Sequence, residues 1–98
     1  MFVRTDLPLP QQLVQSNHAA YEAGILFGDK SQTEPSSLIV IAIKNQAKLQ
    51  KAIDHLRQLN IQLVEFIEPD WEYGLTAFAT QPLTQEQRQV MRKYQLWK

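Results

Sequence analysis

The opening of the chain alternates between a short apolar segment and a longer stretch with helical spacing. Residues 2–5 predict a strand, and Pro8 and Pro10 follow it. Proline cannot donate to a strand ladder but suits the first turn of a helix, so we predict a helix over residues 11–27. Apolar and small side chains recur there at Leu13, Val14, Ala20, Tyr21, Gly24 and Ile25. We expect this stripe to lie on a sheet.

The middle of the chain predicts a loop, a buried strand and a second helix. Residues 28–37 are polar, glycine- and proline-containing and aperiodic, which is typical of a loop. Residues 38–43 (LIVIAI) are apolar on both alternating faces and predict a strand covered on two sides. Asn45 is expected to cap a helix that ends near residue 59, with Asn60 left-handed beyond it. Its core stripe is Leu49, Ala52, Ile53, Leu56 and Leu59.

The last third predicts two strands and a helix. A third strand is expected over residues 61–67, a turn over 68–74 and a fourth strand over 75–80. The connection is too short for a crossover helix, so these two strands should be antiparallel neighbours or a bent pair. Thr84 with Gln87 three residues later is a capping-box signal for a final helix. We expect Ile61, Leu63 and Ile67 on one strand face, and Val90, Met91 and Tyr94 on the helix.

The element order β-α-β-α-β-β-α predicts an α/β fold. Right-handed crossovers make the first three strands run in one direction, with the fourth reversed. The expected architecture is a three-layer α/β/α domain around a mixed, mostly parallel four-stranded sheet.

Length and composition narrow the class of protein. The 98 residues fit one domain, and the absence of cysteine excludes disulfides and thiolate metal sites. The formal net charge is zero, so no overall field attracts nucleic acid or a membrane. No signal-peptide pattern opens the chain, and its longest apolar run, residues 38–43, is far too short for a bilayer. We expect a soluble cytoplasmic protein.

Two short motifs near the start carry a family resemblance. The segment VRTDL, followed by QSNHAA on the first predicted helix, resembles the beginning of the archaeal and eukaryotic type (type two) of peptidyl-tRNA hydrolase. The likeness extends more weakly to LVEFIEPD, LTAFATQP and the closing KYQLWK. It covers most of the chain, and the order of elements agrees with it. The resemblance implies the fold of that family.

The resemblance also implies a reaction and residues to perform it. The family cleaves the ester between a peptide and the terminal ribose of its tRNA, which requires an activated water, donors for an oxyanion and cations for phosphates. The family lysine falls on Gln11, the aspartate on Glu68 or Asp70, and one threonine on Thr76. Gln15 and His18 match the helix motif.

Departures from the family pattern weaken the expected activity. Gln11 can donate a hydrogen bond but carries no charge with which to neutralise a phosphate. The bend before it has prolines where the family has glycines and lysines, and after the fourth strand only Pro82 matches. We therefore expect weak hydrolysis or none.

Two rows of polar side chains follow helical spacing. One row on the first helix could line a cleft or form a solvated flank, and consists of Gln11, Gln15, His18 and Glu22. The second row predicts a nucleic-acid contact at Lys44, Lys48 and Lys51, continued by His55, with an exposed helix face as the alternative. A further basic cluster contains Arg88, Arg92, Lys93 and Lys98.

The turn over residues 68–74 combines aromatic and acidic side chains. Trp71 and Tyr73 could stack on a base, although their acidic neighbours favour a cap over the core or a dimer contact. The acidic group Glu65, Glu68, Asp70 and Glu72 has no nearby histidine at ligand spacing, so we expect no metal. No cofactor is expected.

Three functional hypotheses remain open. The first is a peptidyl-tRNA hydrolase-like enzyme that uses His18, Thr76 and either Glu68 or Asp70, with Gln11 and Gln15 as polar positioning groups. The second is a non-catalytic protein-interaction module of the same fold. The third is a module that binds a small ligand. Peptidyl-tRNA and a second copy of the chain are the candidate partners.

Overall fold

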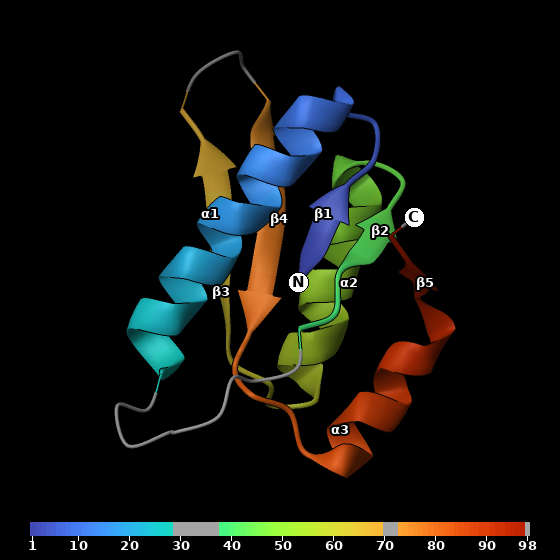
Figure 1. Ribbon diagram of the computed structural model, residues 1–98. Helices are drawn as coiled ribbons and strands as arrows, with labels where there is room; N and C mark the ends of the chain where they lie inside the picture. The colour runs from blue at the N-terminus through green and yellow to red at the C-terminus, as the bar shows by residue number, and fades with distance from the viewer. Residues whose placement is uncertain (29–37, 70–72, 98) are drawn as a thin grey trace.

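The computed structural model describes residues 1–28, 38–69 and 73–97. Its elements are β1 (Phe2–Arg4), α1 (Leu9–Phe27), β2 (Ile41–Ile43), α2 (Gln46–Gln58), β3 (Leu63–Glu68), β4 (Gly74–Thr80), α3 (Gln85–Val90), a 3-10 turn (Met91–Lys93) and β5 (Gln95–Leu96) (Figure 1). The predicted order of elements is confirmed. A fifth strand follows it.

The sheet is mixed, with strand order β3-β4-β1-β2-β5. β1 pairs in parallel with β2, whereas the β1–β4, β2–β5 and β3–β4 ladders are antiparallel. β1, β2 and β3 therefore run in one direction and β4 is reversed, as predicted. The α/β class is confirmed, but the expected four-stranded, mostly parallel sheet is wrong in its strand number and its ladders. The reason is that β3 joins the sheet beside the reversed β4 at one edge, and β5 closes the other edge.

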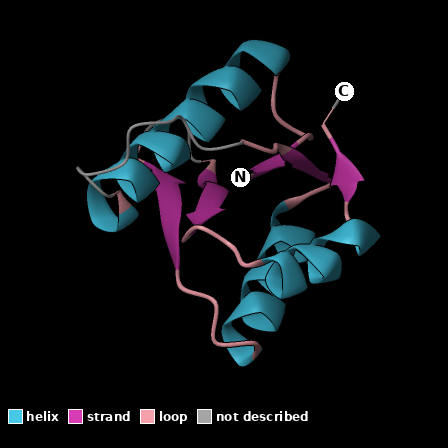
Figure 2. Cartoon of the chain, turned by 60° about the horizontal axis from the view of Figure 1, so that its bottom comes forward, coloured by secondary structure: helices cyan, strands magenta, loops and turns pink. Residues whose placement is uncertain are grey.

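Helices cover both faces of the sheet. α1 lies on one face, mainly over β3 and β4, and α2 lies on the other with α3 beside it (Figures 1 and 2). The sheet thus separates two layers of helix with different interfaces.

The face under α2 is a conventional apolar core. Phe2 of β1 stacks on Phe78 of β4, with ring centroids 4.3 Å apart, and Tyr94 meets Phe2 edge-on at 5.1 Å. The buried members are Phe2, Ile41, Ile43, Leu49, Ala52, Ile53, Leu56, Ile61, Leu75 and Phe78. The predicted stripe of α2 is confirmed except at Leu59, which is exposed beyond the last turn.

Local capping signals set the ends of the helices on this side. The Asn45 side chain accepts a 2.9 Å hydrogen bond from the Lys48 amide and starts α2. Asn60 adopts a φ of 61°, and Ile61 N–H donates to the Leu56 carbonyl, which closes a Schellman motif. Thr84 and Gln87 form the predicted capping box of α3. These three predictions are confirmed.

The face under α1 differs from the prediction. The expected stripe of Leu13, Val14, Tyr21 and Ile25 points away from the sheet, and α1 buries Gln12, Gln15, Ser16 and Ala19 instead. The strands present Val3 and the small side chains Ala77 and Ala79 to it. Small residues on the sheet admit a close helix, and the polar side chains of α1 find hydrogen-bond partners there, so they can be buried.

Two strands are shorter than their apolar runs. β2 covers only Ile41–Ile43, because Leu38 and Ile39 are exposed before it. β3 begins at Leu63, leaving Ile61 buried as part of the end of α2, and Ile67 is exposed. A prediction from the apolar runs alone therefore places the start of both strands too early in the sequence.

Within the described residues, no helix is both long and apolar enough to cross a bilayer.

Candidate active site

Four of the predicted site residues meet in one network of hydrogen bonds around Gln15. Gln15 is fully buried beneath α1, and its Nε2 donates to Glu68 Oε2 at 2.6 Å and to Gln11 Oε1 at 3.1 Å. Its Oε1 accepts from Thr76 Oγ1 at 3.1 Å. The network joins α1 to the last residue of β3 and to β4. We call Gln11, Gln15, Glu68 and Thr76 the polar cluster.

A β-bulge brings Thr76 to the cluster. In the β3–β4 ladder Phe66 pairs with Ala77, but the next residue, Ile67, pairs with Leu75. Thr76 is the extra residue on β4, and its side chain lies on the α1 side together with that of Ala77. Bulges commonly redirect one side chain in this way. Regular alternation would have pointed the hydroxyl toward α2.

The hydrogen-bond donors of Gln15 and Thr76 are already used. Both N–H groups of the Gln15 amide have acceptors, which also fixes the orientation of that amide. The Thr76 hydroxyl has one proton and two acceptors in reach, Gln15 Oε1 and the Phe66 carbonyl at 3.2 Å, and its side chain is fully buried. The cluster is therefore a closed structural link at Gln15 and Thr76, with Gln11 and Glu68 half-buried at its margin.

His18 lies beside the cluster and outside its hydrogen bonds. Its ring stacks on Phe66 of β3, with centroids 4.5 Å apart and planes within 2° of parallel, and the residue is exposed. Within the described residues the imidazole takes no part in the bonds that join Gln15, Glu68 and Thr76. Phe66 connects His18 to the polar cluster, because its ring stacks on His18 and its carbonyl accepts a hydrogen bond from Thr76. Asp70, the alternative to Glu68, lies outside the described residues, as do Trp71 and Glu72.

The opening motif holds a clamp that the sequence reasoning missed. Arg4 Nη1 donates to the carbonyls of Tyr73 at 2.6 Å and Leu75 at 3.0 Å, and so fastens the start of β4 to β1. Arg4 also forms a bidentate pair with Asp6, both bonds being 2.9 Å. These bonds hold the pKa of Asp6 below its ordinary value. The Arg-x-Asp spacing was the available signal for this pair.

Gln12 is a second buried glutamine that was missed. Its Nε2 donates to the Leu7 carbonyl at 2.8 Å, and its Oε1 accepts from the indole N–H of Trp97 at 2.7 Å. Gln12 thereby joins the β1–α1 connection to the end of the chain. Its partners are 5 and 85 positions away, so helical periodicity gave no sign of the second one.

The basic row lies on the other side of the sheet from the polar cluster. Lys44, Lys48 and Lys51 are exposed, and the last two are on α2, whereas the cluster is under α1. His55 is not exposed like these lysines: it is half-buried, and its Nδ1 shares a 3.2 Å hydrogen bond with the Tyr94 hydroxyl. Burial raises the pKa of Tyr94. A phosphate held by the lysines of α2 would be remote from the cluster.

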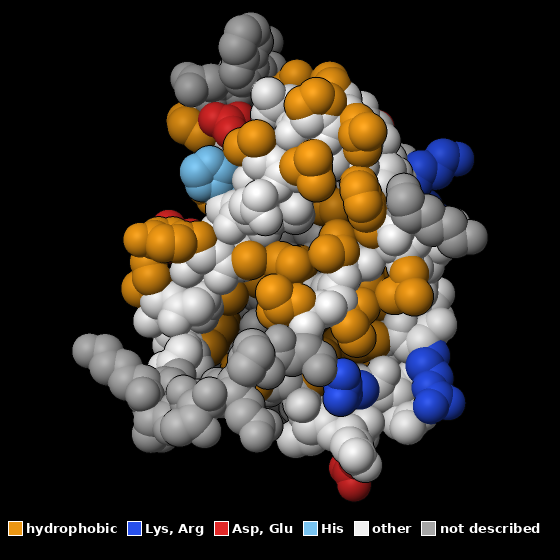
Figure 3. Space-filling view, viewed as in Figure 1, with side chains coloured by type: hydrophobic (Ala, Val, Ile, Leu, Met, Phe, Trp, Pro, Cys, Tyr) orange, Lys and Arg blue, Asp and Glu red, His pale blue; other side chains and the backbone are white. Residues whose placement is uncertain are grey.

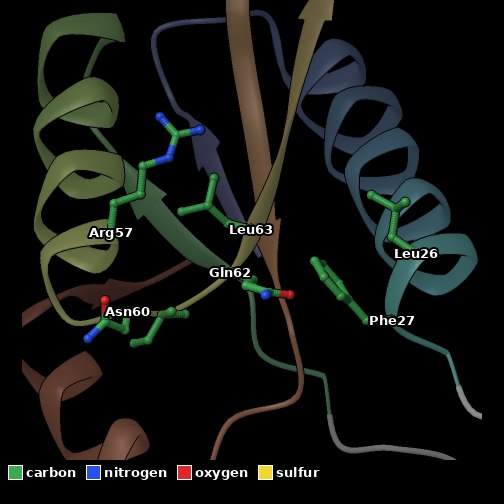
Figure 4. A pocket seen from close by; sticks show the side chains of 7 residues that line it. Leu26, Phe27, Arg57, Asn60, Gln62 and Leu63 are labelled. Atoms are coloured by element: carbon green, nitrogen blue, oxygen red, sulfur yellow. The ribbon is translucent and has the colours of Figure 1, made fainter.

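Two of the surface hollows formed by described residues do not contain the cluster. One, of about 620 Å³, lies between the end of α1 and the start of β3, where Phe27 and Gln62 point toward one another (Figure 4). The other, of about 610 Å³, lies between β2 and the C-terminal segment and includes Arg88, Arg92 and Tyr94. The hydrogen-bond geometry, not the size of a hollow, marks the candidate site.

The described residues contain no group of three or more histidine, cysteine, aspartate or glutamate side chains placed to hold a metal ion.

Comparison with known proteins finds no matching family model, no matching curated protein and no matching solved structure. The kinship with type two peptidyl-tRNA hydrolases stays a prediction based on the residues quoted above.

Proposed function

We propose that the chain is a peptidyl-tRNA hydrolase-like domain with a degraded active site, which hydrolyses the peptide–tRNA ester weakly or not at all. The observation that carries this proposal is the polar cluster. Gln11, Gln15, Glu68 and Thr76 were selected from the family resemblance, and they are joined by hydrogen bonds although they come from three different elements. Of the two other residues selected in the same way, His18 lies beside this network and Asp70 lies outside the described residues.

Low hydrolytic activity is expected because the hydrogen-bond donors of Gln15 and Thr76 already have partners within the fold. Ester hydrolysis needs hydrogen-bond donors aimed at the developing oxyanion. The N–H groups of Gln15 are occupied and the Thr76 hydroxyl is buried, so neither is available to a substrate. Glu68 and His18 are the remaining groups that could accept a proton from water. The proposed site therefore retains a candidate base, and its remaining donor among the described residues is the half-buried, uncharged Gln11 amide, whose Oε1 is already held by Gln15.

Weak substrate binding is the second part of the proposal. Gln11 supplies no charge at the position of the family lysine, and the lysines of α2 lie on the opposite face of the sheet. Contact of Lys44, Lys48 or Lys51 with tRNA, if made, would give affinity without presenting the ester to the cluster. Binding and cleavage should therefore be separable in this chain.

Release of labelled peptide from peptidyl-tRNA tests the proposal, with an authentic type two hydrolase as the positive control. We expect release at least about 100-fold slower than that control, the usual cost of losing a positioned catalytic group. Any release above buffer should fall in Glu68→Gln and His18→Ala. It should persist in Glu86→Gln, which removes an exposed carboxylate on α3.

Two results would contradict the proposal. Release within about tenfold of the authentic hydrolase would show a competent site. Release that survives both Glu68→Gln and His18→Ala would place any activity elsewhere.

A further inference from the structure

The outward face of α1 is apolar and uncovered. Five large side chains of this helix are exposed on it: Leu9 at 58%, Leu13 at 50%, Val14 at 43%, Tyr21 at 70% and Ile25 at 62%. We call them the outer α1 face. The space-filling view shows apolar side chains gathered over this helix on one side of the molecule (Figure 3). A solvated flank would carry charges here, so the pattern calls for a partner.

The outer α1 face has no ionisable side chain apart from the Tyr21 phenol. The charged or titratable groups of the helix are Glu22 and His18, which follow Gln15 at helical spacing on the flank toward the cluster. Pro10, Asn17, Ala20 and Gly24 complete the face. A partner therefore needs apolar surface and no complementary charge.

The area of the face is smaller than one side of a standard protein interface. Covering these five side chains would remove roughly 500 Å² of apolar surface. That lies at the upper end of the largest patch on a typical monomer, about 300–600 Å². A standard interface buries about 800 Å² per partner, so two such faces, with roughly 1,000 Å² in total, would form the small interface of a weak, concentration-dependent dimer.

We propose that the outer α1 face is the contact surface between two copies of this chain, related by a two-fold axis. In such a pair each patch meets an identical patch, so a face without charges avoids like-charge repulsion. Ala20 and Gly24 lie one turn apart, and a Cβ at Gly24 would meet no atom within 4 Å. Two helices can approach closely where such small residues meet.

No described part of the chain covers this face. Residues 29–37, the longest part outside the described structure, contain no apolar side chain except Pro35. Self-association does not depend on peptidyl-tRNA hydrolysis, and the two proposals can fail separately.

Sedimentation velocity of the full chain from micromolar to sub-millimolar concentration tests the dimer. We expect the mass to rise from 11.4 kDa to twice that value. Leu13→Glu or Ile25→Glu should raise the dissociation constant about 100-fold or more, because each copy would bring a charged carboxylate into an apolar contact. Leu59→Glu, an exposed leucine after α2, is the matched control and should leave the dissociation constant unchanged. Circular dichroism confirms that each variant is folded.

A unique cysteine locates the contact independently, because the chain has none. Gly24→Cys should yield a covalent dimer with a bifunctional maleimide, and Asp54→Cys on the exposed side of α2 should not. A monomer at every concentration overturns the proposal, even if a different protein binds the face. Equal weakening by Leu59→Glu, or equal cross-linking through Asp54→Cys, overturns it as well.

Discussion

The two faces of the sheet are held by opposite kinds of interface. Under α2, leucine and isoleucine side chains interlock with the paired rings of Phe2 and Phe78, and burial of apolar surface dominates. Under α1, alanine side chains of β4 face a helix that buries two glutamines and a serine. The same sheet thus has an apolar layer on one side and a layer rich in hydrogen bonds on the other.

This difference teaches that an amphipathic helix need not direct its apolar side inward. α1 reserves its larger side chains for solvent or a partner, and satisfies its buried amides within the fold. Burial of these polar side chains costs little folding free energy only while every buried polar atom has a hydrogen-bond partner. The α2 side should therefore tolerate the loss of a polar group and be destabilised by truncation of an apolar side chain, whereas the α1 side should do the reverse.

Truncation of a leucine on each helix gives the largest expected contrast. Leu56→Ala on α2 should lower the free energy of unfolding by about 2–5 kcal/mol, because it leaves a cavity in a fully buried site. Leu13→Ala on α1 should change it by less than about 0.5 kcal/mol. Urea denaturation at low micromolar protein, where association is minimal, measures both. A large loss for Leu13→Ala under those conditions would show that α1 buries its apolar side within the monomer.

Removal of the Gln15 amide gives the intermediate effect. Gln15→Leu keeps the size of the side chain but takes one donor from Glu68 and one acceptor from Thr76, so it should cost about 1–3 kcal/mol of unfolding free energy. Gln50→Leu, at an exposed position of α2, is the matched control and should stay within about 0.5 kcal/mol.

Combining Gln15→Leu with Thr76→Val sharpens this test. The two changes should be non-additive by at least about 0.5 kcal/mol in chemical denaturation, since each removes the same hydrogen bond. Strict additivity would mean that the cluster contributes no coupled stability and that the α1 side is held by packing alone.

The α2 side was predictable because its determinants are local. Apolar spacing along α2, the Asn45 cap, the left-handed Asn60 and the Thr84–Gln87 box each depend on residues within a few positions of one another. Hairpin pairing of β3 with β4 followed from a short connection. Local chemistry therefore fixed both the elements and the face that α2 buries.

The α1 side was not predictable in the same way because its partners are distant along the chain. Periodicity identified a helix, but the choice of buried face depended on Ala77 and Ala79 of β4. Hydrogen bonds join Gln15, Glu68 and Thr76, which the sequence had placed in one predicted site, while the bulge that redirects Thr76 left no recognisable signal. β5, with two residues, is too short to produce a pattern.

The smallest expected effect is a pH dependence at the margin between the two faces, where Arg4 of β1 reaches Gln46 of α2 and the carbonyls of β4. The hydrogen bonds from Arg4 lower the pKa of Asp6 in the folded chain. This contribution to stability is present above the unfolded pKa of about 3.9 and is lost as the pH falls through the lower folded pKa. Because the Asp6 side chain is 37% exposed, its contribution should be on the order of a few tenths of a kcal/mol.

Urea midpoints measured from neutral pH to below pH ~3.9 should converge for wild type and Asp6→Asn at the acid end and separate above it, with wild type the more stable. A constant difference across that range would mean that the carboxylate charge is irrelevant and that Arg4 acts only through the backbone of β4.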